Sequence, residues 1–361
     1  MIETLLVIDD DVMDRMGGMI RHLCVGLIDE AVLVTVLSRS ARDQSDAQVA
    51  PAQVAHLTGG RWPWQHAQPD KVLQAIGGRK PAIIHCMSAQ LAAWAEPLCA
   101  AWGAALVVQL SDLHDVVRFA RLKPGCPVTG VAMTAGIQRT LTENLPRWQP
   151  HIRLIPAGLP AEAEVSALSV PNRLPSAVTT MSLSKRSSLM NVLKALQTLI
   201  KAGHDVQLFL LSSGWAESRY RRHVYQLGLH RYVTFAGRQR DWTVLRRAMV
   251  AADFYIATGV TERFNISGLS ALGSGLVILA PHHALEDYLI DDETAVRFDP
   301  ASPQQLAQKW MELLQDPDRA RTLAENALNY ARTHHQANTM VTQLAALYRE
   351  MTESRSKVTV E

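Results

Sequence analysis

A pair of glycines near the N-terminus is the first place where residue types suggest chemistry. Gly17 and Gly18 lie between an apolar run at 5–8 and an amphipathic stretch at 19–28. Glycines in a turn before a helix let the backbone approach an anionic ligand, and the helix N-terminus adds N–H groups and a positive dipole end. A plain tight turn explains the pair equally well, so the pair alone does not decide between them.

The acidic run Asp9–Asp11 precedes these glycines and is similar to the opening of a response-regulator receiver domain. That class needs a phospho-acceptor aspartate at the end of a later strand, and Asp43 and Asp46 have no apolar run before them. The receiver interpretation is therefore disfavoured. The run also contains the Asp-x-Asp spelling of a metal site, but we expect it to face solvent or to cap the glycine turn.

Two further groups of residues admit two interpretations each, and a single interpretation is preferred for the cysteines. The basic and aromatic segment Arg118–Lys123 could rest on an anionic membrane surface or form a solvated loop. Trp62 and Trp64 could stack on an acceptor sugar or anchor their own loop. The four cysteines have no metal-ligand spacing, so we expect buried free thiols in a reducing cytoplasm: Cys24, Cys86, Cys99 and Cys126.

The composition narrows the class of protein. The 361 residues are 48% hydrophobic and 19% charged, with a formal net charge of +2. This balance is typical of a globular protein with two domains and gives no reason to expect nucleic acid as a partner. No uncharged apolar run is long enough for a transmembrane helix, and the first residues lack the features of a signal peptide. We therefore expect a cytoplasmic protein, with a peripheral contact at the inner face of the membrane as an option.

Short apolar runs alternate with helical stretches along both halves of the chain, which predicts β-α-β units and parallel sheets. In the N-terminal half the predicted strands are 5–8, 31–37, 82–85, 105–110, 128–133 and 152–155, and the predicted helices are 19–28 and 90–102. In the C-terminal half the predicted strands are 178–181, 206–211, 232–235, 254–257, 276–279 and 295–298. The predicted helices there are 189–202, 217–227, 243–251, 303–314, 317–334 and 337–351.

Two such halves in tandem predict an α/β fold with two Rossmann-like, doubly wound domains facing a cleft. We expect an N-terminal domain at 1–160, a linker at 161–176 and a C-terminal domain at 177–335. A last helix at 336–352 would cross back to the N-terminal domain. Ligands of such sheets bind at the carboxyl ends of the strands near the switch point, so the cleft is the expected site.

One segment of the C-terminal half has a specific pattern. Residues 262–278 hold a glutamate, a phenylalanine, small residues and a glycine in a fixed register before a strand: Glu262, Phe264, Ala271 and Gly275. This pattern resembles that of the family 4-like glycosyltransferases (group 1) of the GT-B fold. Flanking matches extend the resemblance over nearly the whole chain; they include Ile155–Gly158, Ala251–Asp253, Glu286, Asp299–Pro300 and Leu313–Pro317.

The resemblance implies roles for individual residues. Glu262 would contact the donor sugar, and the backbone from Phe264 to Gly268 would cradle phosphate oxygens at the start of a helix. Ser270 stands where the family has a second glutamate that holds the ribose. The implied donor-binding residues are Gly17, Gly18, Gly237, Phe264, Asn265, Ile266, Ser267 and Ser270.

The sequence also departs from the family at several positions. Asn265 replaces a glycine, and Ser182 and Ser187 stand where the family has an arginine and a lysine that neutralise the diphosphate. Lys185 and Arg186 could take over this task. In the N-terminal half Ser111 and Asp112 replace a His-Asp pair, so the acceptor-side candidates are His85, Ser111, Asp112 and His114.

The resemblance implies a hexosyltransferase that moves a sugar from a nucleoside-diphosphate sugar to a glycan or lipid-linked hydroxyl acceptor, with retention and without a metal ion or other cofactor. Glu262, Lys185 and Arg186 would be its catalytic residues. The departures leave open a second interpretation, a GT-B protein without catalysis that binds or scaffolds a partner. A third, a nucleotide-sugar epimerase-like enzyme, lacks a Gly-x-Gly-x-x-Gly after any predicted strand.

Overall fold

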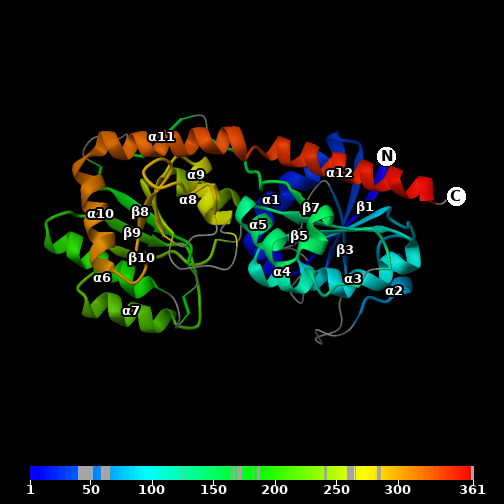
Figure 1. Ribbon diagram of the computed structural model, residues 1–361. Helices are drawn as coiled ribbons and strands as arrows, with labels where there is room; N and C mark the ends of the chain where they lie inside the picture. Colours follow the sequence, from blue (N-terminus) through cyan, green and yellow to red (C-terminus); the bar gives the residue numbers. More distant parts are fainter. Residues whose placement is uncertain are drawn as a thin grey trace. The chain divides into compact units, whose positions relative to one another are not determined.

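The computed structural model describes most of the chain. The described residues are 1–39, 52–57, 66–123, 125–162, 164–165, 167–168, 173–181, 183–184, 188–239, 242–257, 264, 266–282 and 286–358. They form two compact units (Figure 1). The N-terminal unit contains residues 1–158, 262–264 and 335–361, and the C-terminal unit contains residues 159–261 and 265–334.

The N-terminal unit is built on a seven-stranded parallel sheet with the strand order β3-β2-β1-β4-β5-β6-β7. The strands are β1 (Ile2–Ile8), β2 (Val32–Ser38), β3 (Gln53–His56), β4 (Ile83–Cys86), β5 (Ala105–Leu110), β6 (Val128–Ala132) and β7 (Ile152–Leu154). Central strands of such a sheet are covered on both faces, and every residue of β5 is buried. The chain order reverses between β1 and β4, so the switch point of this sheet lies there.

The helices of the N-terminal unit are α1 (Asp10–Asp29), α2 (Pro69–Ala75), α3 (Ala89–Trp102), α4 (Leu113–Phe119), α5 (Ala135–Asn144), the 3₁₀ helix η2 (Pro146–His151) and α12 (Ala337–Val358). Helix α12 packs on α1, although the two are at opposite ends of the chain (Figure 1). A Cβ atom at Gly26 of α1 would lie 2.8 Å from Val341 Cγ2 of α12, so a larger residue there would push the helices apart. Arg349 also pairs with Glu30 at 2.9 Å.

The predicted glycine turn is wrong. Helix α1 begins at Asp10, directly after β1, and Gly17 and Gly18 lie two turns inside it. Asp9 is the N-cap, since its carboxylate accepts the backbone N–H of Val12 at 2.9 Å. The sequence misled because two consecutive glycines disfavour a helix; here packing overrides the propensity, with Gly18 buried in the helix face. The glycines therefore do not offer a ligand the start of a helix.

The C-terminal unit is built on a six-stranded parallel sheet with the strand order β10-β9-β8-β11-β12-β13. The strands are β8 (Ser176–Thr179), β9 (Gln207–Leu210), β10 (Val233–Phe235), β11 (Phe254–Ile256), β12 (Val277–Pro281) and β13 (Val296–Phe298). The helices are α6 (Leu189–Lys201), α7 (Glu217–Gln226), α8 (Trp242–Val250), α9 (Ile266–Gly273), α10 (Pro303–Gln315) and α11 (Pro317–His334). The predicted fold class, two Rossmann-like α/β domains, is confirmed.

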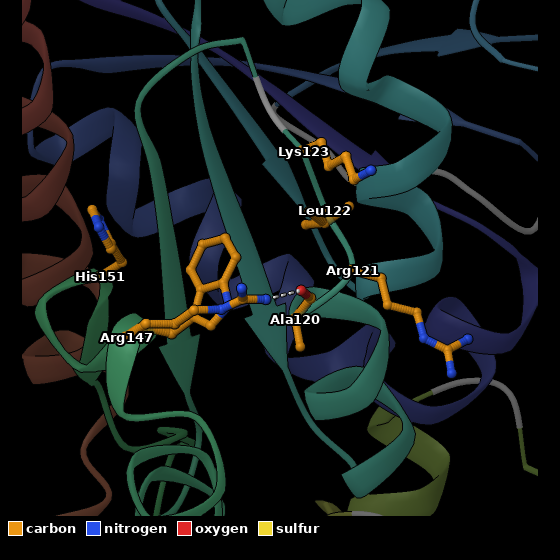
Figure 2. Close-up of a pocket in the computed structure, with 7 residues that line it drawn as sticks. Ala120, Arg121, Leu122, Lys123, Arg147 and His151 are labelled. Carbon is orange, nitrogen blue, oxygen red and sulfur yellow. Dashed lines mark hydrogen bonds between the residues drawn. The ribbon is translucent and has the colours of Figure 1, made fainter.

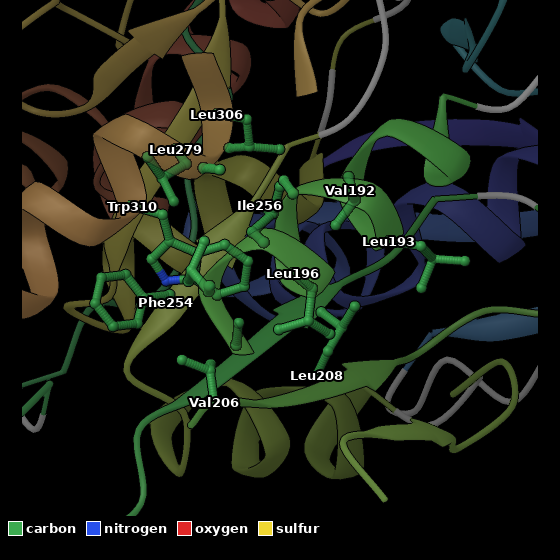
Figure 3. Packing of buried hydrophobic residues seen from close by; sticks show 14 of the residues in the cluster. Val192, Leu193, Leu196, Val206, Leu208, Phe254, Ile256, Leu279, Leu306 and Trp310 are labelled. Atoms are coloured by element: carbon green, nitrogen blue, oxygen red, sulfur yellow. The ribbon is translucent and has the colours of Figure 1, made fainter. Parts of the chain in front are cut away.

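The core of the C-terminal unit lies between its sheet and the helices α6 and α10 (Figure 3). Helix α6 buries residues at helical spacing, including Val192, Leu196 and Leu199. Trp310 of α10 is fully buried, and its ring centroid is 6.0 Å from that of Phe254 on β11. This packing fixes the positions of the strands, and the carboxyl ends of these strands form the edge at which the candidate site lies.

The first residues of the C-terminal unit are held by polar contacts. The Glu162 carboxylate pairs with Arg246 of α8 at 2.7 Å, and the Glu162 backbone N–H donates to the Gly273 carbonyl at 2.7 Å. Asp253 holds the other end of this segment, because its buried carboxylate accepts hydrogen bonds from Leu168 N, from Ser176 N and Oγ, and from Arg173. In the part of the chain that the structure describes, no helix has the length and apolar character needed to span a membrane.

Candidate functional site

The switch point of the C-terminal sheet lies between β8 and β11, where the strand order changes direction. Helix α9 follows β11 and begins at Ile266, so its first turn lies at the carboxyl edge of the sheet beside this switch point. A helix N-terminus at such a position favours an anionic group. The local geometry therefore fits a phosphate-bearing ligand, which is what the 262–278 motif predicts.

Two buried tyrosines that sequence reasoning missed support this edge. The hydroxyl of Tyr255 on β11 is 3.0 Å from Thr180 Oγ1, just after β8. Tyr288 is fully buried, and burial raises the pKa of its hydroxyl well above the usual value, although a hydrogen bond from the Leu269 backbone N–H of α9 opposes the shift. The tyrosines thus tie the start of α9 and the end of β8 to the sheet. In the sequence, only the aromatic character of Tyr255 and Tyr288 indicates that they have a structural role.

The hydroxyl of Ser270, the residue expected to contact the ribose, makes a hydrogen bond within its own helix. The side chain is 5% exposed, and its hydroxyl donates to the Ile266 carbonyl oxygen at 2.8 Å. This bond from a serine to the residue four positions earlier is a common way of satisfying a hydroxyl in a helix. Ser270 consequently has no proton left to donate to a ribose hydroxyl, and it cannot reproduce the grip of a carboxylate.

The remaining motif residues are placed as follows. Phe264 is 4% exposed and belongs to the N-terminal unit, where its backbone N–H donates to the Ser111 carbonyl at 2.7 Å. Gly237 follows β10, two strands away from β8, with a φ of 73° that favours glycine. Glu262, Asn265, Lys185 and Arg186 lie outside the described residues, as do Ser182, Ser187, Trp62 and Trp64.

The two residues that precede Lys185 and Arg186 are held by hydrogen bonds. The Leu183 carbonyl accepts the Ala216 N–H at 3.1 Å, and the Ser184 carbonyl accepts the Tyr220 hydroxyl at 2.8 Å. Gly214 permits this approach, because a Cβ atom there would lie 2.2 Å from the Leu183 carbonyl oxygen. The backbone at residues 183–184, which leads to the two cations, is therefore anchored beside Gly214.

Substituting Gly214 by alanine should displace residues 183–184 and, with them, the two cations that follow. The clash involves backbone atoms and cannot be relieved by a side-chain rotation, so we expect binding of a nucleoside diphosphate to weaken by roughly tenfold or more, from the loss of a charged hydrogen bond. Calorimetric titration with UDP measures this. Gly203→Ala is a control for glycine replacement, because its Cβ would meet no atom within 4 Å, although its φ of 86° costs some stability. Equal affinity of the Gly214→Ala variant and the wild type would contradict the anchoring role.

The C-terminal unit also has a cavity of about 400 Å³ on the β8–β9 side of its sheet. Its walls are mainly apolar and include Val178, Phe209, Leu211 and Val244. The one cationic side chain among the lining residues is Arg173, which is paired with Asp253. This cavity does not fit a diphosphate.

The carboxyl edge of the N-terminal sheet is lined by helix starts. Four helices begin there with a side chain that accepts the backbone N–H three residues later: Asp9 for α1, Ser88 for α3, Asp112 for α4 and Thr134 for α5. The acidic run is thereby explained in part, because Asp9 caps α1 and Asp11 pairs with Arg15 at 2.9 Å.

Asp115 is the residue at this edge that the sequence did not reveal. It is 1% exposed; one carboxylate oxygen accepts Ala89 N–H at 2.9 Å and the other accepts the N–H and hydroxyl of Ser111 at 3.1 and 3.2 Å. Burial, and secondarily the charge of Asp112, raises its pKa. Ser111 and Asp112 are also buried, so among the four acceptor-side candidates His114 is the one with an exposed side chain.

His85 does not lie where an acceptor could reach it, which corrects the prediction. It is fully buried on β4, and its Nδ1 lies 2.6 Å from the Tyr348 hydroxyl of α12. Its Nε2 has no hydrogen bond among the described residues. Burial lowers the pKa of His85 to about 4, with a smaller opposing effect from the Gln109 side chain. His85 therefore connects α12 to the sheet as a neutral imidazole.

The buried His85 predicts a loss of stability in acid. An unfolded histidine titrates near pH 6.5 and the folded His85 near pH 4, so between these values the unfolded chain binds more protons. The free energy of unfolding should fall as the pH drops from about 6.5 to about 4, by about 3 kcal/mol in total. Urea unfolding at a series of pH values measures this. His85→Gln should flatten the dependence and the exposed His230→Gln should not; an unchanged slope in His85→Gln would refute the assignment.

Solved structures define the class of this fold. A sucrose-phosphate synthase from Thermosynechococcus elongatus superposes with a TM-score of 0.77 and 17% identity, covering 98% of this chain and 100% of its own. HepE of Anabaena, in complex with UDP and glucose, gives 0.76 and 17% identity over 96% and 99%. A glycosyltransferase from Rickettsia africae gives 0.74 and 14% identity over 97% and 98%. The chain thus has the two-domain GT-B fold.

A family match covers most of the C-terminal domain. Residues 175–316 match the family described as glycosyl transferases group 1. The matched range contains the 262–278 motif, so the predicted resemblance to the group 1 glycosyltransferases is confirmed. A search of curated proteins found no match.

Proposed function

We propose that the protein transfers a hexose from a nucleoside-diphosphate sugar to a hydroxyl acceptor, with retention of the anomeric configuration. The observation that carries this proposal is the group 1 family match at 175–316, in which α9 begins beside the switch point of the sheet. The diphosphate would lie at the first turn of α9, and Glu262 would contact the donor sugar. Fold alone does not establish the chemistry, so the donor site has to be tested directly.

The leaving group of such a transfer is a nucleoside diphosphate, whose charge grows as the bond to the sugar breaks. Fixed donors aimed at that charge stabilise the transition state. Backbone N–H groups of α9 and the cations Lys185 and Arg186 would supply them. The acceptor, a glycan or a lipid-linked glycan, would lie against the N-terminal domain near His114. The protein would work in the cytoplasm. Where the acceptor is a lipid, Arg118–Lys123 would make a peripheral contact with the membrane.

Calorimetric titration with UDP, GDP, ADP and TDP tests the donor site. HepE was solved with UDP and with UDP-glucose, which makes UDP the first nucleotide to titrate. Selective binding of one nucleotide, together with release of that nucleotide from its sugar conjugate in the presence of an acceptor, would support the transferase. A folded protein that binds none of the four would rule it out.

We expect transfer to need no metal ion, since protein cations and helix N–H groups would neutralise the diphosphate. Activity in excess EDTA should stay within about twofold of the untreated rate, because a metal that stabilised the transition state would contribute several kcal/mol. Added Mg²⁺ after EDTA is the matched control. A large loss in EDTA that Mg²⁺ restores would contradict this expectation.

A second candidate function is a GT-B protein without catalysis that binds or scaffolds a partner. The observation that favours it is the Ser270 hydroxyl, which is bonded within α9 and replaces a ribose-binding carboxylate. This candidate predicts no turnover of any sugar nucleotide. Binding of a nucleotide without turnover, unchanged after Glu262→Ala, would support it over the transferase.

A further inference from the structure

A basic pocket of about 540 Å³ lies in the N-terminal unit, away from the edge described above (Figure 2). Its lining comprises residues 120–123, which follow α4, and Arg147, Trp148 and His151 of η2. The first segment leads toward β6 and η2 leads directly into β7, so the pocket lies where these parallel strands begin. This is the amino edge of the sheet, opposite to the carboxyl edge with its helix starts. The pocket is therefore separate from the proposed acceptor region.

The lining is cationic. Arg121, Lys123 and Arg147 are exposed, and the lining residues include no carboxylate. The neighbouring acid is Glu96 of α3, whose Oε1 accepts the Lys123 backbone N–H at 3.2 Å. Three of the lining side chains are cationic and none is acidic, so an anion is favoured there.

Arg147 is held in place at the centre of the pocket. One of its terminal nitrogens donates to the Ala120 carbonyl oxygen at 3.1 Å, as Figure 2 shows. Its guanidinium carbon lies 5.8 Å from the centroid of the Trp148 ring. The other N–H donors of this guanidinium have no partner among the described residues. A positioned guanidinium with free donors matches the geometry of a phosphate, which it can bind with two parallel hydrogen bonds.

Trp148 provides the second, independent observation. Its ring packs against Phe119, with centroids 4.8 Å apart, and meets the His151 ring edge-on at 5.9 Å. Its indole Nε1 is shielded from solvent and has no hydrogen-bond partner within the described parts of the chain. Buried donors are rarely left without an acceptor in native proteins. Since solvent does not reach the N–H group in this structure, a ligand acceptor would bind it only after the Trp148 ring moves.

We propose that this pocket binds an organic phosphate, with Arg147 and Lys123 on the phosphate group and Trp148 against the organic part. A cavity of about 540 Å³ is larger than an inorganic phosphate needs, which leaves room for the organic group. Soluble phosphate esters and phosphomonoester lipid headgroups share this chemistry. The site does not depend on donor binding or on sugar transfer.

Two matched probes test the proposal: glycerol 3-phosphate by equilibrium dialysis, and phosphatidylcholine vesicles with and without phosphatidic acid by sedimentation. Binding of glycerol 3-phosphate indicates a soluble ester, and binding only to the phosphatidic acid vesicles indicates a lipid headgroup. Each result supports the proposal if the Lys123→Gln/Arg147→Gln variant binds at least about tenfold more weakly. The control Lys71→Gln/Lys80→Gln removes the same charge from exposed positions of the same unit and should bind as the wild type does.

Trp148→Phe provides a second variant, which keeps an aromatic ring at this position but is smaller and lacks the Nε1–H donor. We expect it to weaken binding by a few-fold, and circular dichroism confirms that each variant is folded. No binding of either probe by the wild type would overturn the proposal. Equal binding by the two charge-matched double variants would overturn it too, because the attraction would then be nonspecific.

Discussion

Replacing both Lys185 and Arg186 by alanine is expected to weaken UDP binding by about 100-fold or more. Each cation would make a charged hydrogen bond to the diphosphate, and such bonds contribute about 1.5–3 kcal/mol each. Transfer should suffer more than binding, with a loss in kcat/KM on the order of 10³, because charge on the leaving group is greatest in the transition state. Calorimetry and a nucleotide-release assay measure the two effects separately.

The control for this variant is Lys194→Ala/Lys201→Ala, which removes the same two charges from exposed positions of α6 in the same domain. It should bind UDP within about twofold of the wild type, since screened surface charges contribute little at a distance. Equal losses in both double variants would mean that net charge, and not the 183–188 loop, attracts the nucleotide. Unchanged affinity in Lys185→Ala/Arg186→Ala would show that this pair does not replace the missing arginine and lysine.

Replacing Asp253 by alanine is expected to lower the free energy of unfolding by about 1–3 kcal/mol, the usual cost of leaving buried hydrogen-bond donors unpaired. The carboxylate is 1% exposed and accepts backbone N–H groups from Leu168 and Ser176 as well as the Arg173 guanidinium. Its removal leaves these donors unpaired at the amino edge of β8 and β11. Urea denaturation at neutral pH measures the loss.

Asp318→Ala is the matched control, because Asp318 is exposed in the first turn of α11. Its loss should cost less than about 1 kcal/mol through the helix dipole. Asp253→Asn keeps the volume but turns an amide N–H₂ toward donors, so it should remain well below the wild type in stability. A cost for Asp253→Ala as small as that for Asp318→Ala would show that the network carries little energy.

Periodicity predicted the strands and long helices because their burial follows a regular pattern along the sequence. Residues 105–110 are apolar except for Gln109 and form β5, and 317–334 is an amphipathic stretch that forms α11. Short polar elements gave no comparable signal, and β3 at Gln53–His56 and α2 were not predicted. The start of α1 was predicted too late in the sequence. The low helix propensity of Gly17 and Gly18 was given more weight than the N-cap residue Asp9.

The residues of the candidate site also fall into those that the sequence predicted and those that only the structure reveals. The motif at 262–278 identified the segment that opens α9, since its residue types are tied to a backbone shape. Side chains that act through distant partners could not be found in this way. The sequence predicted that His85 contacts the acceptor, whereas the structure shows its hydrogen bond to Tyr348 of α12. Asp115 and Tyr288 are likewise defined by partners on other elements.

The packing of α12 on α1 has a consequence for biosynthesis. The N-terminal unit needs distant parts of the chain, since residues 1–158 and 335–361 both belong to it. At ~5–20 residues per second, a ribosome takes roughly ten to thirty seconds to synthesise the part between them. Throughout that time the α1 surface around Gly26 and the His85 side chain lack their contacts with α12. Chaperones and proteases can therefore bind the nascent chain until α12 emerges from the ribosome. A premature stop codon after His334 would make this exposure permanent.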